Sequence, residues 1–415
     1  MTDLDGQHAM APWLASPSAQ DPLGAAARAT DAHPGDPLAA AATLRRQLPD
    51  LEPAQAAAVL EQANLRQLAY ERYGLTGDLL LTRDGLEQAT RPAVAARRAG
   101  MITRSGATRV LDLTAGLGLD TMAFVDAGLT VTAIERESAT AAFLAHNCPS
   151  ARVLCADATE PTLLATLLAE LGPKDVVFVD PARRNPAGPR DVTSGRAHPE
   201  RDPARWSPPW PFVQGIPHDR VLAKVAPGFS PPADWHAEWT SVDRTLLECA
   251  VYSWPAFAVP RRAVLLTHGS LTFLASDPAA APLPVADTSA TWLHEPDPAV
   301  VRAGALAALA DLDPGIARYD DDSSWLTSDR ASTSPAARSF HINAELTGSP
   351  RQQRRQLADL GVRRATIKSR DVDISPRAVL RELGLSEGPE HVLVLTRRAG
   401  RVVTLLTEPS AARSD

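Results

Sequence analysis

The stretch that decides the fold is Val110-Leu111-Asp112-Leu113-Thr114-Ala115-Gly116-Leu117-Gly118-Leu119-Asp120-Thr121. A short apolar run, typical of a buried strand, ends in the carboxylate of Asp112. A loop with Gly116 and Gly118 follows and opens a predicted helix. Glycine is needed where a ligand approaches the backbone without a Cβ in the way, or where φ is positive. The pattern therefore predicts a nucleotide-like ligand lying across this turn.

Four more apolar runs follow this stretch and alternate with spacers of helical length. The predicted strands are 109–113, 130–134, 152–155, 176–179 and 221–225. Strands that alternate with helices form βαβ units and a mainly parallel sheet. We expect this α/β domain to run over residues 101–275, with closing strands at 264–268 and 271–274.

Acidic residues end successive predicted strands and point to the cofactor. Glu135 ends the second strand, where a carboxylate accepts hydrogen bonds from ribose hydroxyls, and Asp157 ends the third, placed to accept from an adenine amine. A dinucleotide loop would have a third glycine where Thr121 stands, and Asp120 would repel a pyrophosphate at the helix N-terminus. A cationic cofactor without phosphates, S-adenosylmethionine (SAM), fits better.

These residues resemble the class I SAM-dependent methyltransferases over about residues 90–269. Asp112, Gly116 and Gly118 match the first motif of that family, Glu135 the second and Asp157 the third. The resemblance implies a Rossmann-like sheet and a set of residues that contact SAM. This cofactor set is Asp112, Thr114, Gly116, Gly118, Asp120, Glu135, Asp157, Ala158 and Asp180. The residue sequence of the first motif is most similar to that of RNA methyltransferases of the trimethylguanosine-synthase and ribosomal-RNA guanine types.

The segment 178–184, Phe-Val-Asp-Pro-Ala-Arg-Arg, looks like the fourth motif, which carries the chemistry. Asp180 is the main catalytic candidate, since it can orient the methyl acceptor or take its proton. Pro181 and Arg183 complete the catalytic set. Family members with an aromatic residue here stack the target base on it, whereas this chain has Ala182 and Arg183. The acceptor atom therefore stays open.

The substrate side has two interpretations. Arg183, Arg184 and Lys224 either contact phosphate or form an ordinary charged rim. The region 181–217 contains nine prolines and is predicted to be a long loop at the ligand edge of the sheet. Its aromatic residues either stack a base or anchor the loop on the sheet, and we favour the anchor. These aromatic residues are Trp206, Trp210 and Phe212.

The C-terminal part differs from the rest in charge. Residues 351–401 hold 12 Lys plus Arg and 6 Asp plus Glu, a net charge of +6, which leaves -13 elsewhere in a chain of net charge -7. This end of the chain is similar to the THUMP-like domain of a bacterial group of methyltransferases. THUMP domains bind RNA, usually tRNA, so the resemblance implies Arg364, Lys368 and Arg370 as RNA contacts. A solvated basic helix is the alternative.

The remaining organisation follows from composition. We predict a disordered leader over 1–37, a helical subdomain over 38–100, a linker with a connecting helix over 276–332 and a THUMP-like domain over 333–408. Three cysteines without CxxC spacing and no converging histidines predict no metal site. No apolar run is long enough to predict a membrane span, and the sequence suggests a cytoplasmic protein.

Together these features predict a SAM-dependent methyltransferase acting on a base in structured RNA, either tRNA or rRNA. One alternative is methylation of a small molecule or a protein. The other is a noncatalytic SAM-binding or RNA-binding protein. The sequence does not decide the target nucleotide or the oligomeric state.

Overall fold

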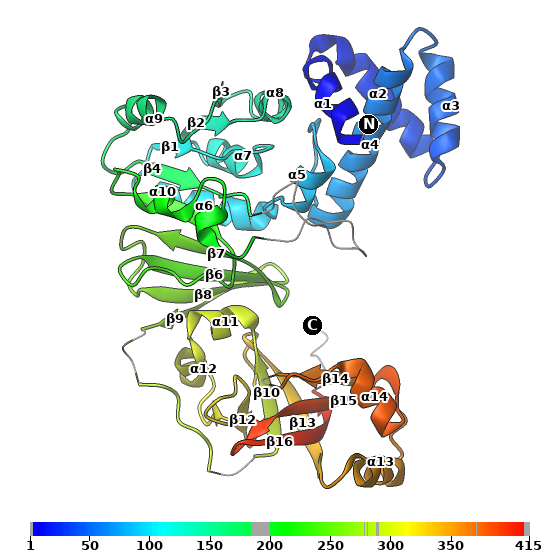
Figure 1. The fold of residues 1–415 in the computed structure, drawn as a ribbon, viewed down its shortest axis with the longest axis vertical. Helices are drawn as coiled ribbons and strands as arrows, with labels where there is room; N and C mark the ends of the chain where they lie inside the picture. Colours follow the sequence, from blue (N-terminus) through cyan, green and yellow to red (C-terminus); the bar gives the residue numbers. More distant parts are fainter. Residues whose placement is uncertain are drawn as a thin grey trace. The chain divides into compact units, whose positions relative to one another are not determined.

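The computed structural model describes residues 3–183, 200–277, 279, 281–287, 290–370 and 372–410, with side chains described from residue 9 onward (Figure 1). The chain forms two compact units. The first consists of Met1–Val225 with Tyr252–Ala256, and the second of Ala226–Val251 with Phe257–Asp415. The division falls within the predicted sheet domain rather than near residue 275, because the last strands of that domain pack mainly with the C-terminal part.

The first unit begins with helices where a disordered leader was expected. Its helices before the sheet are α1 (Asp3–Leu14), η1 (Pro17–Ala19), α2 (Gln20–Ala32), α3 (Pro37–Gln47), α4 (Pro53–Tyr73), α5 (Arg83–Glu87) and α6 (Pro92–Arg104). Local signals define α4 well: Pro53 stands at its first position, Glu52 and Gln55 form a capping box, and Gly74 ends it in the left-handed conformation.

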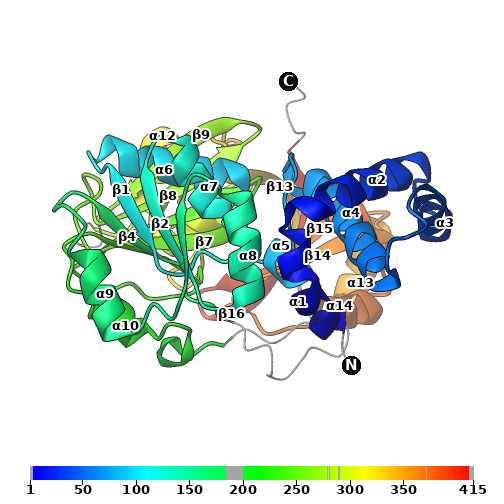
Figure 2. The same cartoon turned by 90° about the horizontal axis from the view of Figure 1, so that it is seen from above.

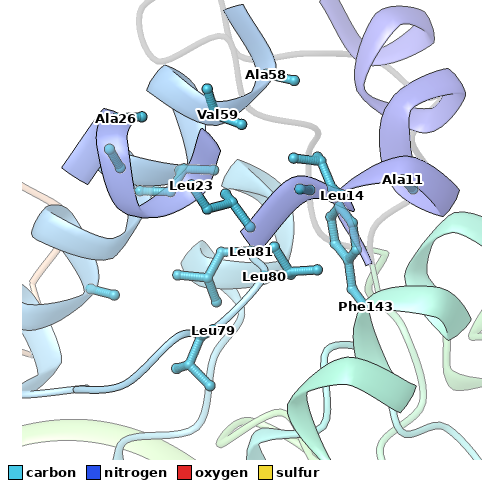
Figure 3. Packing of buried hydrophobic residues seen from close by; sticks show 14 of the residues in the cluster. Ala11, Leu14, Leu23, Ala26, Ala58, Val59, Leu79, Leu80, Leu81 and Phe143 are labelled. Carbon is cyan, nitrogen blue, oxygen red and sulfur yellow. The ribbon is translucent and has the colours of Figure 1, made fainter. Parts of the chain in front are cut away.

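The prediction of a disordered leader over 1–37 is wrong because α1 and α2 bury their small apolar residues. Leu14 is 1% exposed and joins a core cluster with Leu23, Leu80 and Phe143. Figure 3 shows Phe143 of α8 (Ser138–Asn147) reaching Leu14 of α1. Helix α8 lies beside α1 (Figure 2). It also contacts strands β2 (Thr130–Glu135) and β3 (Arg152–Cys155). The N-terminal helices therefore share one core cluster with α8, a helix that itself contacts the sheet.

The predicted parallel sheet is confirmed in this unit. Its strand order is β3-β2-β1-β4-β5, with β1 (Arg109–Asp112), β4 (Val176–Val179) and β5 (Val221–Val225), and each neighbouring pair is parallel. The order reverses between β1 and β4, the place where open α/β sheets bind ligands. The remaining helices of the unit are α7 (Leu119–Asp126), α9 (Pro161–Leu168), η2 (Pro203–Arg205) and α10 (Trp210–Gln214).

The second unit starts with four strands in the order β7-β6-β8-β9. These are β6 (His236–Val242), β7 (Thr245–Tyr252), β8 (Arg261–Thr267) and β9 (Ser270–Ser276). Strands β6 and β8 are parallel, and β8 and β9 form an antiparallel hairpin. The closing strands predicted at 264–268 and 271–274 correspond to β8 and β9, each longer than expected.

A seven-stranded sheet follows, in the order β11-β12-β10-β13-β16-β15-β14. Its strands are β10 (Trp292–Pro296), β11 (Ala317–Arg318), β12 (Leu326–Ser328), β13 (Ala337–Leu346), β14 (Arg364–Ser369), β15 (Ser386–Arg398) and β16 (Arg401–Pro409). Its helices are α11 (Pro298–Ala303), α12 (Leu306–Leu312), α13 (Pro350–Asp359) and α14 (Pro376–Leu383).

The segment 276–332, predicted as a linker with one helix, therefore supplies three strands of this sheet. Strand β10 pairs antiparallel with both β12 and β13, and the predicted helix divides at Gly304, which has a φ of +71°. The two faces of the sheet carry separate apolar clusters. Leu357 of α13 and Val379 of α14 belong to one, and Trp325 and Phe340 belong to the other.

Candidate functional site

Asp112 ends β1 and is fully buried. Its Oδ2 accepts a hydrogen bond from the Thr121 hydroxyl at 2.7 Å, and its Oδ1 accepts from the Thr114 amide at 3.1 Å. Loss of water contact raises the pKa of Asp112 to about 7, against these two hydrogen bonds, which lower it. The charges of Asp120 and Asp180 raise it further. The carboxylate thus ties the loop after β1 to the first turn of α7.

The two glycines of this loop do different things. Gly116 has a φ of +55°, and a Cβ added there would meet no atom within 4 Å. Gly118 has a φ of +88°, and a Cβ there would lie 2.6 Å from the Cys148 Sγ and 2.6 Å from the Leu144 Cδ1. Gly116 therefore leaves open space above the loop for a ligand, whereas Gly118 allows the close packing of α7 and α8.

Glu135 ends β2 beside the glycine loop and is partly exposed. Its Oε2 accepts from the Gly116 amide at 3.1 Å and its Oε1 from the Glu137 amide at 2.8 Å. In the sheet register, Asp112 lies opposite Ala133 of β2, just before Glu135. The structure thus brings the predicted ribose-binding carboxylate next to the loop that the cofactor would cross.

Asp157 lies just beyond the end of β3 and is exposed, while the neighbouring Ala158 is buried. The Asp157 Oδ1 accepts from the Thr159 hydroxyl at 2.7 Å and the Thr159 amide at 2.9 Å. These bonds hold the pKa of Asp157 below its ordinary value. Carboxylate acceptors therefore follow β2 and β3, as the hydrogen-bond donors of a ribose and an adenine require.

Asp180 follows β4, and its backbone amide donates to the Thr114 hydroxyl at 2.6 Å. Its carboxylate, with the side chain 28% exposed, forms an ion pair with Lys224 of β5. The Lys224 side chain is only 8% exposed, so it is not placed as the phosphate contact that the sequence suggested. The structure instead makes it a partner of the catalytic candidate.

Asp120 lies in the same buried region, and its carboxylate is bound by other side chains of the protein. Arg98 of α6 forms an ion pair with its Oδ1, and the Thr90 hydroxyl donates to its Oδ2 at 2.6 Å. Burial raises the pKa of Asp120, but Arg98 and then Lys224 outweigh burial and hold it below the ordinary value. Because Arg98 neutralises Asp120, the electrostatic argument against a pyrophosphate loses its force. Sequence analysis missed Thr90 and Arg98, which lie outside every family motif.

The loop after β4 is anchored by its tryptophans, as we favoured from the sequence. Trp206 and Trp210 are 4% and 7% exposed, and their rings meet edge to face at 6.5 Å. Ser207 and Ala182 exchange backbone hydrogen bonds of 2.7 and 3.0 Å. The Arg136 guanidinium, next to Glu135, donates to the Ser207 hydroxyl at 3.0 Å. This part of the loop is therefore fixed to the cofactor edge of the sheet.

The other predicted residues near β4 take three positions. Pro181 is buried directly after Asp180. Arg183 is partly exposed, and its carbonyl accepts from the Glu200 amide at 2.6 Å. Phe212 is partly buried in α10, and Arg184 lies outside the described residues.

In the second unit, the three basic residues assigned to RNA have acidic partners within the chain. The Lys368 Nζ lies 2.9 and 2.8 Å from the two carboxylate oxygens of Glu295, and the Arg370 Nη2 lies 3.7 Å from one of them. Arg364 is exposed and pairs with Glu390 at 3.0 Å. The pairing with the largely buried Glu295 gives Lys368 and Arg370 a role in connecting β14 and the residue after it to β10.

No group of three or more His, Cys, Asp or Glu residues in the described part of the chain could hold a metal ion. No helix within it has the length and apolar character needed to cross a membrane.

The parallel sheet, its glycine loop and the carboxylates at its strand ends define a SAM-dependent methyltransferase. Ribosomal RNA small subunit methyltransferase J of Alkalilimnicola ehrlichii is 31% identical to this chain over 213 residues, which are 46% of this chain and 77% of that protein. The chain therefore belongs to the family of SAM-dependent methyltransferases that includes this enzyme, and SAM is its cofactor.

Two further comparisons agree. A family model described as THUMP domain-like matches residues 337–409, which confirms the predicted character of the C-terminal domain. A solved structure from Porphyromonas gingivalis W83, classed as that of a methyltransferase, has a TM-score of 0.70 and 22% identity. It covers 94% of this chain and 99% of its own, which supports the fold of nearly the whole chain.

Proposed function

We propose that this enzyme transfers a methyl group from SAM to a base in structured RNA, with small-subunit ribosomal RNA as the first candidate substrate. The observation that carries the proposal is the similarity to methyltransferase J across 77% of that enzyme, whose name gives small-subunit ribosomal RNA as its target. The THUMP-like match at residues 337–409 adds a domain similar to a class that binds RNA. Exposed arginines on α13, at Arg351 and Arg355, offer a basic surface for phosphates.

The described residues fit the cofactor. Open space above Gly116 leaves room for the cofactor to approach the backbone, and Glu135 and Asp157 offer carboxylate oxygens to its ribose and adenine. SAM would supply a methyl group on a sulfonium: the acceptor lone pair would form the new bond, the S–C electron pair would stay on sulfur, and the acceptor proton would pass to Asp180 or to water. The role of this chain's residues is to hold the acceptor atom in line with the S–C bond that breaks.

Asp180 is the residue proposed to meet the acceptor. It lies at the end of β4 beside the cofactor loop, and its partly exposed carboxylate can accept a hydrogen bond from an N–H group of a base. Correct positioning of two reactants lowers the barrier by as much as about 7–11 kcal/mol in favourable systems. Positioning by Asp180 is therefore an adequate basis for catalysis, without a strong base.

The test is transfer of label from methyl-labelled SAM to purified RNA. Ribosomal subunits, naked rRNA and tRNA from a strain that lacks the gene serve as separate substrates, with a protein extract and a small-molecule extract beside them. We expect label in small-subunit rRNA with the wild-type enzyme and a much lower but measurable amount with Asp180→Asn, whose amide oxygen is a weaker acceptor. Label only in protein or small molecules, or SAM binding without label anywhere, would overturn the RNA assignment.

A further inference from the structure

Lys224 is an enclosed ammonium group close to the strand ends. Its side chain is 8% exposed, and its Nζ forms an ion pair with the Asp180 Oδ2. The same Nζ donates to the Thr90 hydroxyl at 2.8 Å and lies 3.8 Å from the Asp120 Oδ2. An ammonium group has three protons, and these three oxygens lie in its immediate surroundings. Lys224 therefore points into the protein network rather than toward a substrate phosphate.

The donor and the acceptor of each hydrogen bond in this network can be assigned. Thr90 accepts from Lys224, so its one hydroxyl proton is available for Asp120, to which it donates at 2.6 Å. Arg98 pairs with the other carboxylate oxygen of Asp120, and its guanidinium lies 5.3 Å from the centre of the Phe178 ring in β4. Asp120 is thereby fixed from two sides.

Among the described residues, the ion pairs of this network join the cations of Lys224 and Arg98 to the carboxylates of Asp120 and Asp180. Burying an ion pair is costly unless both charges are well partnered, and removing one partner leaves an uncompensated charge. Asp120 has Arg98 as its own close partner, at a side-chain exposure of 2% for Arg98 and 10% for Asp120. Lys224 is then the cation that compensates Asp180, the most exposed member of the network at 28%.

We propose that Lys224 is a positioning residue for Asp180, and that Thr90 and Asp120 hold Lys224 for that task. Lys224 fixes one carboxylate oxygen of Asp180, which leaves the carboxylate in one orientation with its other oxygen as the acceptor for the substrate N–H. This inference rests on the proposed function of Asp180. It also makes the segment before the sheet part of the catalytic apparatus, because Thr90 and Arg98 both precede β1.

A double-mutant cycle tests the proposal. Asp180→Asn, Lys224→Met and the double variant are compared by kcat and KM for RNA and by calorimetric affinity for SAM. If Lys224 acts through Asp180, Lys224→Met lowers kcat by about 10- to 100-fold alone, in the range that misplacement of a reacting group causes. In the Asp180→Asn background it then changes kcat by less than about threefold, because interacting residues are not additive. SAM affinity stays near the wild-type value in Lys224→Met, and Lys224→Met changes it no further in the Asp180→Asn background. Effects that multiply, or a loss confined to KM for RNA, would overturn the proposal.

Thr90 provides a milder variant should Lys224→Met fail to fold. Thr90→Val removes the hydroxyl and keeps the shape, whereas Thr90→Ser keeps the hydroxyl. We expect Thr90→Val to lower kcat and Thr90→Ser to retain most of it. Equal activity of the two variants would contradict the role given to the hydroxyl.

A readout without turnover separates this inference from the proposed function. The backbone amide signal of Asp180 in a nuclear magnetic resonance spectrum should shift in Lys224→Met. Asp180 both forms the ion pair with Lys224 and donates its amide hydrogen bond to the Thr114 hydroxyl, so loss of the ion pair changes the surroundings of that amide. Lys174→Met, at an exposed lysine before β4, is the matched control and should leave that signal in place. An unmoved signal in Lys224→Met would overturn the pairing even in an enzyme that methylates no RNA. A moved signal with no RNA labelled by the wild type would reject the proposed substrate alone.

Discussion

The Thr114 hydroxyl accepts a hydrogen bond from the Asp180 amide at 2.6 Å, and the Thr114 amide donates to Asp112 at 3.1 Å. One residue therefore connects the buried carboxylate at the end of β1 with the catalytic candidate at the end of β4. These strands are neighbours in the sheet, with Asp112 opposite Phe178. Thr114 thus fixes the position of Asp180 relative to the cofactor loop.

Thr114→Val should therefore impair turnover more than cofactor binding. The valine keeps the shape but offers no acceptor to the Asp180 amide, and a displacement of about 1 Å at a reacting group can lower the rate about 100-fold. The lost hydrogen bond should cost about 1 kcal/mol of folding free energy. Steady-state kinetics and calorimetry with SAM make the measurement. Thr114→Ser keeps the hydroxyl and is the control; a serine variant as impaired as the valine variant would argue against this role.

Alanine is expected to have different effects at the two glycines: a steric loss of stability at Gly118, and weaker SAM binding at Gly116. At Gly118 the new Cβ would overlap Cys148 and Leu144, and overpacking costs typically about 1–3 kcal/mol. At Gly116 the Cβ enters open space, so we expect only the left-handed backbone cost of roughly 1–2 kcal/mol, together with weaker SAM binding. Urea unfolding and SAM titration of both variants test this. Normal SAM affinity in Gly116→Ala would show that the cofactor does not approach that side of the loop.

The raised pKa of Asp112 should make the free energy of unfolding depend on pH in an unusual direction. Its pKa is about 7 in the folded protein against an ordinary 3.8, so between these pH values the folded state holds a proton that the unfolded chain has released. The contribution of Asp112 to the free energy of unfolding then falls as the pH rises toward about 7. Asp120 has a lowered pKa, so its own contribution is lost only when the pH falls below the ordinary range.

We therefore expect wild-type protein to lose stability from about pH 4 to pH 7 relative to Asp112→Asn, which does not titrate there, and the difference to level off above that range. Urea unfolding at several pH values gives both curves. Parallel curves for the two proteins would contradict a raised pKa of Asp112.

Exposed arginines of α13 should contribute to RNA affinity through phosphate contacts. Arg351→Gln with Arg355→Gln should weaken RNA binding and reduce the slope of log affinity against log salt by about 0.7–0.9 for each lost contact. Arg45→Gln with Arg46→Gln, at two exposed arginines of α3, is the matched control. Equal losses in both pairs would assign the effect to total charge rather than to α13.

Much of the fold could be predicted because its signals are local. The Val110-to-Thr121 stretch combines a strand, a turn and a helix start in one short run, and the acids at later strand ends recur in order. Parallel βαβ topology then brings Asp112, Glu135, Asp157 and Asp180 to one edge of a sheet without knowledge of any other contact. The hairpin of β15 and β16 is equally local, since Ala399 and Gly400, both with positive φ, form the turn between the two strands.

The errors concern contacts between distant parts of the chain. Helix α1 has no distinct apolar face, and it is stabilised by contact with α8, which follows much later in the sequence. Strand β10 lies close to an Ala- and Pro-rich region and becomes a strand by pairing with β12 and β13. The bond from Lys224 to Thr90 joins two residues on opposite sides of the cofactor motifs, and no motif of one sequence indicates such a pair.

The most direct test of the account is nucleoside analysis of small-subunit rRNA by mass spectrometry. Three strains are compared: one lacking the gene, one complemented with the wild-type gene and one complemented with Asp180→Asn at equal protein levels. We expect one methylated base that is present with the wild-type gene, absent without the gene and strongly reduced with Asp180→Asn. Identical methylation in all three strains, with other RNA classes also unchanged, would contradict an RNA methyltransferase.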